Sequence, residues 1–124
     1  MADGKKVMIV DDDLVLRQMY GERLKAEHYE IIEAGSGQEA LDILKDKHPD
    51  IILLDVMMPK MNGIDVLKTI RADENTKDIP VIILTALLQQ IDQIKSLLNE
   101  KDSYLTKSTT LPAEVVKKVQ AVLG

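Results

Sequence analysis

The sequence contains no cysteine, no tryptophan and no phenylalanine. Without cysteine, the chain can form no disulfide, no thiolate nucleophile and no cysteine-ligated zinc site. Without phenylalanine and tryptophan, a core must be built almost entirely from aliphatic side chains. Hydrophobic residues still make up 45% of the sequence, which is enough for a packed core. The length of 124 residues is too short for two domains. We therefore expect one domain over residues 1–124.

Long apolar runs and an excess of basic residues are also missing. No run approaches the length of a membrane span, and residues 1–6 are too polar for a signal peptide. The formal net charge of -5 argues against a nucleic-acid surface, which is normally basic. We expect a cytoplasmic protein that binds neither membrane nor nucleic acid.

Residues 51–63 have the pattern of a buried strand that ends at a functional residue. The first four are apolar without alternation, as in a parallel strand covered by helices on both faces. Asp55 follows at the carboxyl end of this strand, the edge at which α/β proteins place ligands. Asn62-Gly63 can then open a helix. From this stretch alone, Asp55 could equally be a residue that only caps the next loop.

The rest of the chain alternates strand-like and helix-like segments. Further strands are predicted at Val7–Val10, Tyr29–Ala34, Val81–Leu84 and Ser103–Thr106. Helices are predicted over Leu14–Glu27, after a capping box at Ser36–Glu39, after Asn62, along the apolar stripe Leu87–Leu98, and from Pro112 onward. Five strands alternating with five helices predict an α/β fold, in which a five-stranded parallel sheet has helices on both faces.

The first predicted helix is amphipathic. Its apolar residues Leu16, Met19, Tyr20 and Leu24 recur at helical spacing and mark the face expected to turn inward. Asp13 stands just before the helix, and we expect it to serve only as the N-cap.

Polar residues follow four of the predicted strands. They are Asp11 and Asp12, Asp55, Thr85 and Lys107. Parallel strands end at one edge of their sheet, so these side chains should be neighbours. Clustered carboxylates repel one another unless a cation joins them, and oxygen ligands suit Mg²⁺. A lysine suits a phosphate, and a carboxylate can act as a nucleophile to form an aspartyl phosphate.

Each of these residues has an ordinary structural explanation when it is taken alone. Asp11 and Asp12 could form a solvated acidic turn, Thr85 could be a satisfied hydroxyl at a strand end, and Lys107 could be a surface lysine. Their joint placement at one edge favours a functional site.

Four segments, Ile9–Asp13, Leu54–Gly63, Leu84–Ala86 and Tyr104–Lys107, carry a resemblance to a known family. Over almost its whole length the chain resembles the receiver domain of two-component response regulators, of the chemotaxis-receiver type. The resemblance implies a flavodoxin-like sheet with strand order 2-1-3-4-5. It also implies that Asp55 accepts a phosphoryl group from a histidine kinase or a phosphotransfer protein in a phosphorelay.

The resemblance implies a magnesium site next to that aspartate. Asp12 and Asp55 would hold Mg²⁺, the backbone carbonyl of Met57 would be a further ligand, and Asp11 would help through water. The chain would then be no enzyme in the usual sense, since it would catalyse only its own Mg²⁺-dependent phosphorylation and slow dephosphorylation.

The resemblance implies a switch as well. Lys107 would neutralise the charge of the phosphoryl group, and Thr85 would donate a hydrogen bond to one of its oxygens. Tyr104 would change rotamer when Thr85 moves. The change would alter the face formed by the fourth helix, the last strand and the last helix, where an unidentified output partner would bind.

The chain departs from the family pattern in two places. Residues 99–102 replace the usual Gly-Ala turn, and Ser108 replaces the proline that usually follows the lysine. A cis peptide bond costs roughly 3 kcal/mol before a non-proline residue, against under about 1 kcal/mol before proline. We therefore expect a trans Lys107–Ser108 bond.

Two other functions are compatible with the pattern. A receiver-like module could bind a partner without being phosphorylated, although all five site residues are present. A phosphatase with an aspartate nucleophile typically has a second aspartate two residues on, where this sequence has Met57.

Met57 and Leu87 predict a long-lived phosphorylated state. In the family, the residues two beyond the phosphoacceptor and two beyond the threonine flank the path of the attacking water. Bulky apolar side chains there leave the water unpositioned, unless Leu87 instead points into the core from the fourth helix. The variant Met57→Asn with Leu87→Glu should lose its phosphoryl group about tenfold faster, as expected for one hydrogen bond of about 1.4 kcal/mol. Intact mass followed over time measures the decay, and equal or slower decay would contradict the prediction.

Overall fold

The computed structural model describes residues 4–56, 63–85, 95–98, 102–106 and 112–123. Its strands are β1 Lys6–Val10, β2 Glu30–Ala34, β3 Ile51–Asp55, β4 Val81–Thr85 and β5 Ser103–Thr106. Its α-helices are α1 Leu14–Ala26, α2 Gly37–Leu44, α3 Gly63–Ala72 and α5 Pro112–Leu123. The five strands form one parallel sheet in the order β2-β1-β3-β4-β5, which confirms the predicted strand order. The predicted strand bounds agree with the structure to within one residue.

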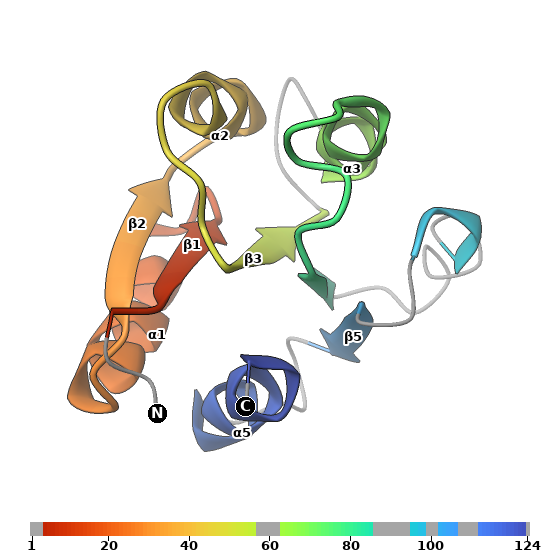
Figure 1. Ribbon diagram of the computed structural model, residues 1–124. Coiled ribbons are helices and arrows are strands. Elements are labelled where there is room, and N and C mark those ends of the chain that lie inside the picture. The colour runs from red at the N-terminus through yellow and green to blue at the C-terminus, as the bar shows by residue number, and fades with distance from the viewer. Residues whose placement is uncertain (1–3, 57–62, 86–94, 99–101, 107–111, 124) are drawn as a thin grey trace.

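The helices lie on both faces of the sheet, as predicted. In Figure 1, α2 and α3 lie on one side of the sheet and α1 and α5 on the other. Alternate residues of each central strand point to opposite sides, so two separate apolar clusters form. Cluster A contains Met8, Val10, Ile52 and Leu54 with the inner residues of α2 and α3, and cluster B contains Val7, Ile9, Ile51 and Leu53 with those of α1 and α5.

Two helix starts follow the predicted capping chemistry. The Asp13 carboxylate accepts hydrogen bonds from the backbone N–H groups of Val15 and Leu16, at 3.0 and 3.2 Å, so Asp13 is the N-cap of α1. The Ser36 hydroxyl accepts one from the backbone N–H of Glu39 at 3.1 Å and caps α2. These side chains satisfy backbone donors that the helix itself leaves without partners.

The predicted inner face of α1 was wrong at Met19. Tyr20 and Leu24 are buried and Leu16 is half-buried, but Met19 is 36% exposed. The buried face is instead centred on Gly21, where an added Cβ would come only into ordinary contact with Ile31, at 3.6 Å. A glycine carries no hydrophobic signal, so the apolar spacing alone misplaced the centre of the face.

Parts of two predicted helices lie outside the described residues. The apolar stripe predicted for a fourth helix falls largely on residues 86–94, and Asn62, predicted to open the third helix, is outside as well. Within the described residues, Lys95–Leu97 forms a short 3-10 helix, η2. In the part of the chain that is described, no helix is both long and apolar enough to cross a bilayer.

Gly63 brings the start of α3 against the carboxyl end of β3. Its backbone N–H donates to the carbonyl oxygen of Val56 at 3.1 Å. A Cβ added at Gly63 would lie 2.5 Å from the Cα of Val56 and closer still to the carbonyl oxygen of Asp55. These are backbone atoms, which cannot move aside as a flexible side chain can. Only glycine therefore lets α3 begin this close to Asp55.

Replacing Gly63 should destabilise the protein. An alanine inside a helix normally stabilises by about 0.5–1 kcal/mol relative to glycine. In Gly63→Ala, overpacking against backbone should outweigh that gain and cost about 1–3 kcal/mol in the free energy of unfolding. Gly21→Ala is the matched control, since its Cβ would meet only side-chain atoms at ordinary distances, and it should be neutral or stabilising. Urea denaturation measures both, and equal stabilities in the two variants would contradict this account.

Candidate functional site

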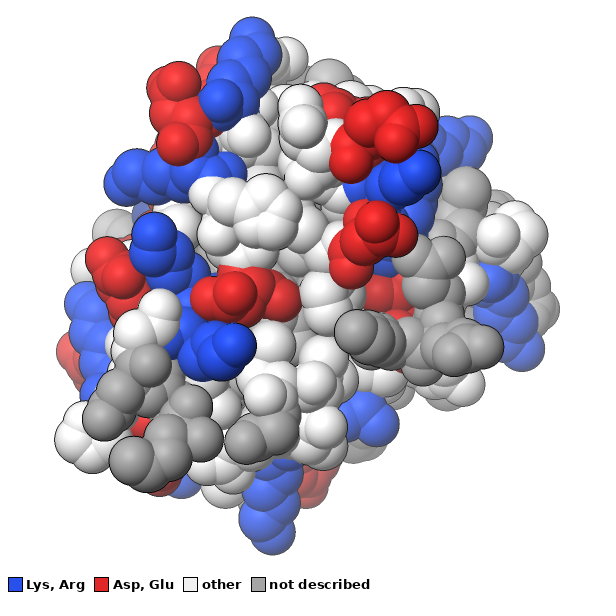
Figure 2. Space-filling view, in the orientation of Figure 1, with Lys and Arg blue, Asp and Glu red and all other residues white. Residues whose placement is uncertain are grey.

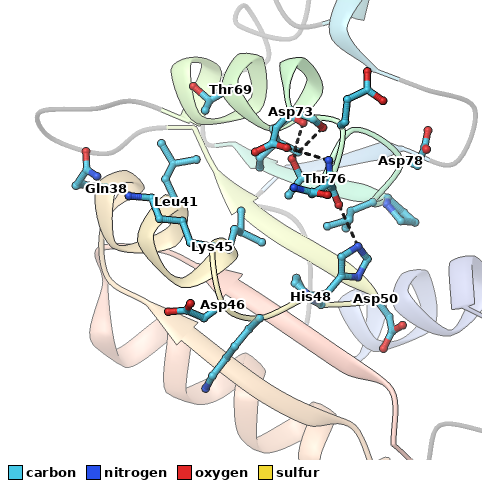
Figure 3. Close-up of a pocket in the computed structure, with 18 residues that line it drawn as sticks. Gln38, Leu41, Lys45, Asp46, His48, Asp50, Thr69, Asp73, Thr76 and Asp78 are labelled. Carbon is cyan, nitrogen blue, oxygen red and sulfur yellow. Dashed lines mark hydrogen bonds between the residues drawn. The ribbon is translucent and has the colours of Figure 1, made fainter.

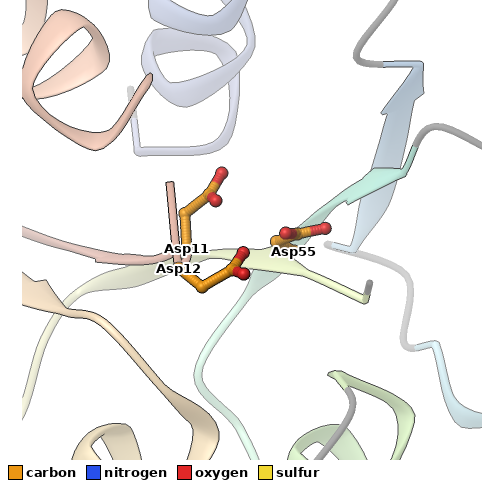
Figure 4. Close-up of side chains that lie close together, drawn as sticks. All are labelled: Asp11, Asp12 and Asp55. Carbon is orange, nitrogen blue, oxygen red and sulfur yellow. The ribbon is translucent and has the colours of Figure 1, made fainter. Parts of the chain in front are cut away.

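Asp11, Asp12 and Asp55 meet at the carboxyl edge of the sheet, as the sequence predicted. One carboxylate oxygen from each lies within 4.8 Å of those of the other two. Figure 4 shows the three side chains close together at the ends of β1 and β3. Asp11 and Asp55 are buried, with 0% and 1% exposure, whereas Asp12 is exposed. The cluster is therefore buried at Asp11 and Asp55 and reached by solvent at Asp12.

The acidic pair is positioned by the end of β1. The backbone N–H of Asp11 donates to the carbonyl oxygen of Ala34 at 3.1 Å, which continues the β1–β2 pairing by one residue. The Oδ1 atom of Asp11 then accepts a hydrogen bond from the backbone N–H of Asp13 at 2.9 Å. This bond turns the chain toward α1 and leaves Asp12 at the outside of the turn. Asp55 needs no such turn, because it is the last residue of β3 and lies beside Leu84 of β4.

Arg17 supports this turn, and the sequence reasoning missed it. Its guanidinium Nη1 donates to the backbone carbonyl of Asp11 at 2.7 Å, and its Nε donates to Oε1 of Glu33 at 3.0 Å. Arg17 is thus held between the ends of β1 and β2. The sequence offers one weak signal, a basic residue one helical turn after the cap Asp13. That signal becomes specific only when Glu33 is known to lie on the neighbouring strand.

The remaining predicted residues are placed only in part. Thr85 ends β4 and pairs with Thr106 of β5 in the ladder, while its side chain is outside the described residues. Tyr104 lies on β5 and is 43% exposed. Lys107 and Met57 are outside the described residues, as is the Lys107–Ser108 bond. Their roles stay predictions.

The three carboxylates fit a hard divalent cation. Mg²⁺ prefers oxygen ligands and usually takes one or two protein carboxylates, filling its other positions with water or phosphate oxygens. A cluster with two buried aspartates and one exposed aspartate offers such ligands with an open side. The mutual repulsion of carboxylates at this distance also favours a cation among them.

A groove lies elsewhere, at the opposite edge of the sheet. It has a volume of about 1010 Å³ and lies between α2, α3 and the connections that lead into β3 and β4. Figure 3 shows His48 on one side of it, within hydrogen-bond distance of the carbonyl oxygen of Asn75, at 3.2 Å. The connections that line it enter the amino ends of the strands. The groove is therefore separate from the acidic cluster.

Charges of both signs are mixed on the visible surface. Among the described residues on the face in Figure 2, Lys and Arg side chains alternate with Asp and Glu. That face presents no broad basic area of the kind that nucleic-acid binding requires.

The fold and the acidic cluster together define an α/β module with a carboxylate site at the carboxyl edge of its sheet, and comparisons with known proteins show its family. The family described as the response regulator receiver domain matches residues 7–120. The chain is 40% identical over 120 residues to the phosphate regulon transcriptional regulatory protein PhoB of Pseudomonas aeruginosa, covering 97% of this chain and 52% of that protein. It is 33% identical to the polar-differentiation response regulator DivK of Brucella ovis, covering 97% of both chains.

A solved structure of a response regulator has the same fold. The response regulator TrrA of Thermotoga maritima, determined in complex with Mg²⁺-BeF, superimposes with a TM-score of 0.82 at 32% identity, covering 95% of this chain and 98% of that chain. The chain spans about half the length of PhoB and nearly all of DivK. This protein belongs to the response regulator receiver domain family of two-component signalling.

Mg²⁺ should stabilise this protein through the acidic cluster. A ligand that binds only the folded state at tenfold excess over its dissociation constant adds about 1.4 kcal/mol to the free energy of unfolding. Asp12→Ala removes an exposed ligand without disturbing the core and should lose most of that gain. Thermal melts with and without millimolar Mg²⁺ measure the effect, and a melting temperature that Mg²⁺ leaves unchanged in the wild type would count against the site.

Proposed function

We propose that the chain works as a single receiver domain in the cytoplasm, in which Asp55 accepts a phosphoryl group from the phosphohistidine of a histidine kinase or phosphotransfer protein. The observation that supports this most is the position of Asp55 as the buried last residue of β3, within 4.8 Å of two more carboxylates. Asp11 and Asp12 would hold Mg²⁺ together with Asp55 and the backbone carbonyl of Met57. When bound, the ion supplies charge stabilisation to the transferred group.

The reaction is a displacement at phosphorus. A carboxylate oxygen of Asp55 forms a bond to phosphorus while the bond from phosphorus to the donor's imidazole nitrogen breaks, and the imidazole keeps the electron pair and takes up a proton. Such transfers depend mostly on positioning and on electrostatic stabilisation. Asp55 supplies the nucleophile at a fixed place, and Lys107 and Thr85 would bind the oxygens of the transferred group.

The first turns of α1 offer a docking surface for the donor protein. Leu14, Val15 and Met19 are 52%, 73% and 36% exposed, although they are large and apolar. They follow directly on the acidic pair, so a protein that covers them would lie beside Asp55. Exposed apolar groups of this kind are typical of protein interfaces. We place the donor's docking site here.

The output partner would bind on the other side of the site. Tyr104 of β5 is exposed, and α5 lies next to β5 in Figure 1. A phosphoryl group at Asp55 would draw in Thr85 and give Tyr104 room to turn inward, which would change the surface of β5 and α5. Phosphorylation would then shift a two-state equilibrium of this face.

Asp55→Asn tests the assignment. After incubation with acetyl phosphate and Mg²⁺, the wild type should gain the mass of one phosphoryl group and Asp55→Asn should gain none, because an amide is not a nucleophile here. Asp13→Asn is the matched control, since asparagine is also a good N-cap and the adduct should form normally. A full adduct on Asp55→Asn would remove the assignment. Steady consumption of acetyl phosphate without a lasting adduct would favour an aspartate phosphatase instead.

A further inference from the structure

β5 is the strand that apolar packing holds least firmly. Its four residues are half-buried or exposed, whereas all five residues of β3 are buried. Of the four, Leu105 is the residue that packs against an apolar cluster, cluster B. A strand with so few buried side chains has a weakly specified register, because a shift exposes little apolar surface.

Asp102 ties β5 to β4 at the amino end of the pair. It directly precedes β5, and its Oδ1 accepts a hydrogen bond from the backbone N–H of Val81, the first residue of β4, at 2.7 Å. Ser103 pairs with Ile82, so Asp102 stands opposite Val81 in the ladder. The bond thus fixes the first step of the β4–β5 register.

Arg71 holds this carboxylate in place. Its Nη2 forms an ion pair with Oδ2 of Asp102, and its Nη1 donates to the carbonyl oxygens of Lys77 and Ile79, at 2.9 and 3.0 Å. The side chain of Asp102 is 0% exposed and that of Arg71 is 11% exposed. Arg71 belongs to α3, which packs firmly against the sheet through cluster A. The position of β5 is therefore tied to α3 and, through it, to cluster A.

Asp50 provides an internal comparison. It precedes β3 as Asp102 precedes β5, and its Oδ2 accepts a hydrogen bond from the backbone N–H of Lys6, the first residue of β1, at 2.7 Å. β3 is buried along its whole length, so its register is strongly specified by packing without this bond. The same type of bond should matter for β5 and be dispensable for β3.

We propose that Asp102, held by Arg71, is a positioning residue for the phosphoryl site. It sets the register of β5 against β4 and thereby the position of the carboxyl end of β5. At that end Thr106 pairs with Thr85, and Lys107 is the next residue in the sequence. A slip of one residue displaces a strand by about 3.3 Å and turns each side chain to the other face. This inference rests on the proposed function, which assigns Thr85 and Lys107 to phosphoryl transfer.

The test compares Asp102→Ala with Asp50→Ala in the full chain. Asp102→Ala should lower the initial rate of phosphorylation by acetyl phosphate by about tenfold or more, since small displacements of groups at a reacting centre have effects of that size. Its dissociation constant for Mg²⁺ should stay within about twofold of the wild-type value, because the carboxylates come from β1 and β3, well separated from the change. Asp50→Ala should keep both the wild-type rate and the wild-type Mg²⁺ affinity.

Amide hydrogen exchange gives a second readout that does not depend on phosphorylation. The backbone amides of residues 103–106 should exchange faster in Asp102→Ala than in the wild type, while those of β1 and β3 stay protected. Asp50→Ala should leave the exchange of β5 unchanged. If Asp102→Ala does not fold, Asp102→Asn takes its place: the amide oxygen can still accept from Val81, but the charge that holds Arg71 is lost, so the rate should fall by a smaller factor at unchanged Mg²⁺ affinity.

Three results would overturn the inference: a wild-type phosphorylation rate in the folded Asp102 variant, a fall in its Mg²⁺ affinity parallel to the fall in rate, or the same fall in rate in Asp50→Ala. A wild-type protein that forms no adduct would instead overturn the proposed function. In that case the exchange of residues 103–106 would still decide whether Asp102 fixes β5.

Discussion

The burial of β3 on both faces is the constraint on which the site depends. Its four aliphatic residues, Ile51 to Leu54, are 0% exposed. Burying one such side chain contributes about 1.5–3 kcal/mol, so the four together contribute roughly as much as the whole net stability of a typical domain. A shift of β3 along its axis would lose much of this free energy of burial. Asp55 can therefore be held among other carboxylates, because the strand that carries it cannot yield to their repulsion.

The two halves of the site are held by different kinds of force. The acidic half, with Asp11, Asp12 and Asp55, comes from β1 and β3, which are fixed by apolar packing on both faces. The proposed second half, Thr85 and Lys107, would come from the ends of β4 and β5, and β5 is held largely by backbone pairing and by the polar contacts of Asp102 and Arg71. The proposed switch would act on this second side, where polar contacts at a sheet edge permit small movements that a packed core resists.

Much of this arrangement could be predicted from local patterns. Apolar runs located the strands, and Asp13 and Ser36 were read correctly as caps, because both signals lie within a few residues. Met19 was wrongly assigned to the inner face of α1, because that face is centred on Gly21, a residue with no hydrophobic side chain. The close approach of Gly63 to the end of β3 and the contacts of Arg17 and Asp102 were not predicted, for a common reason. Each of these residues contacts groups that only the folded chain brings close to it. Spacing along the sequence therefore cannot reveal the contacts.

The unequal exposure of the three aspartates has a consequence for how the site responds to its surroundings. Mobile ions screen charges that water can reach far more than charges that are buried. If the three aspartates bind Mg²⁺ as proposed, Asp12 is the ligand whose contribution would weaken as ionic strength rises, while Asp11 and Asp55 would retain more of theirs. In the proposed site, the affinity for a divalent cation would then respond to salt mainly through Asp12, the side chain that is also open to an incoming phosphodonor.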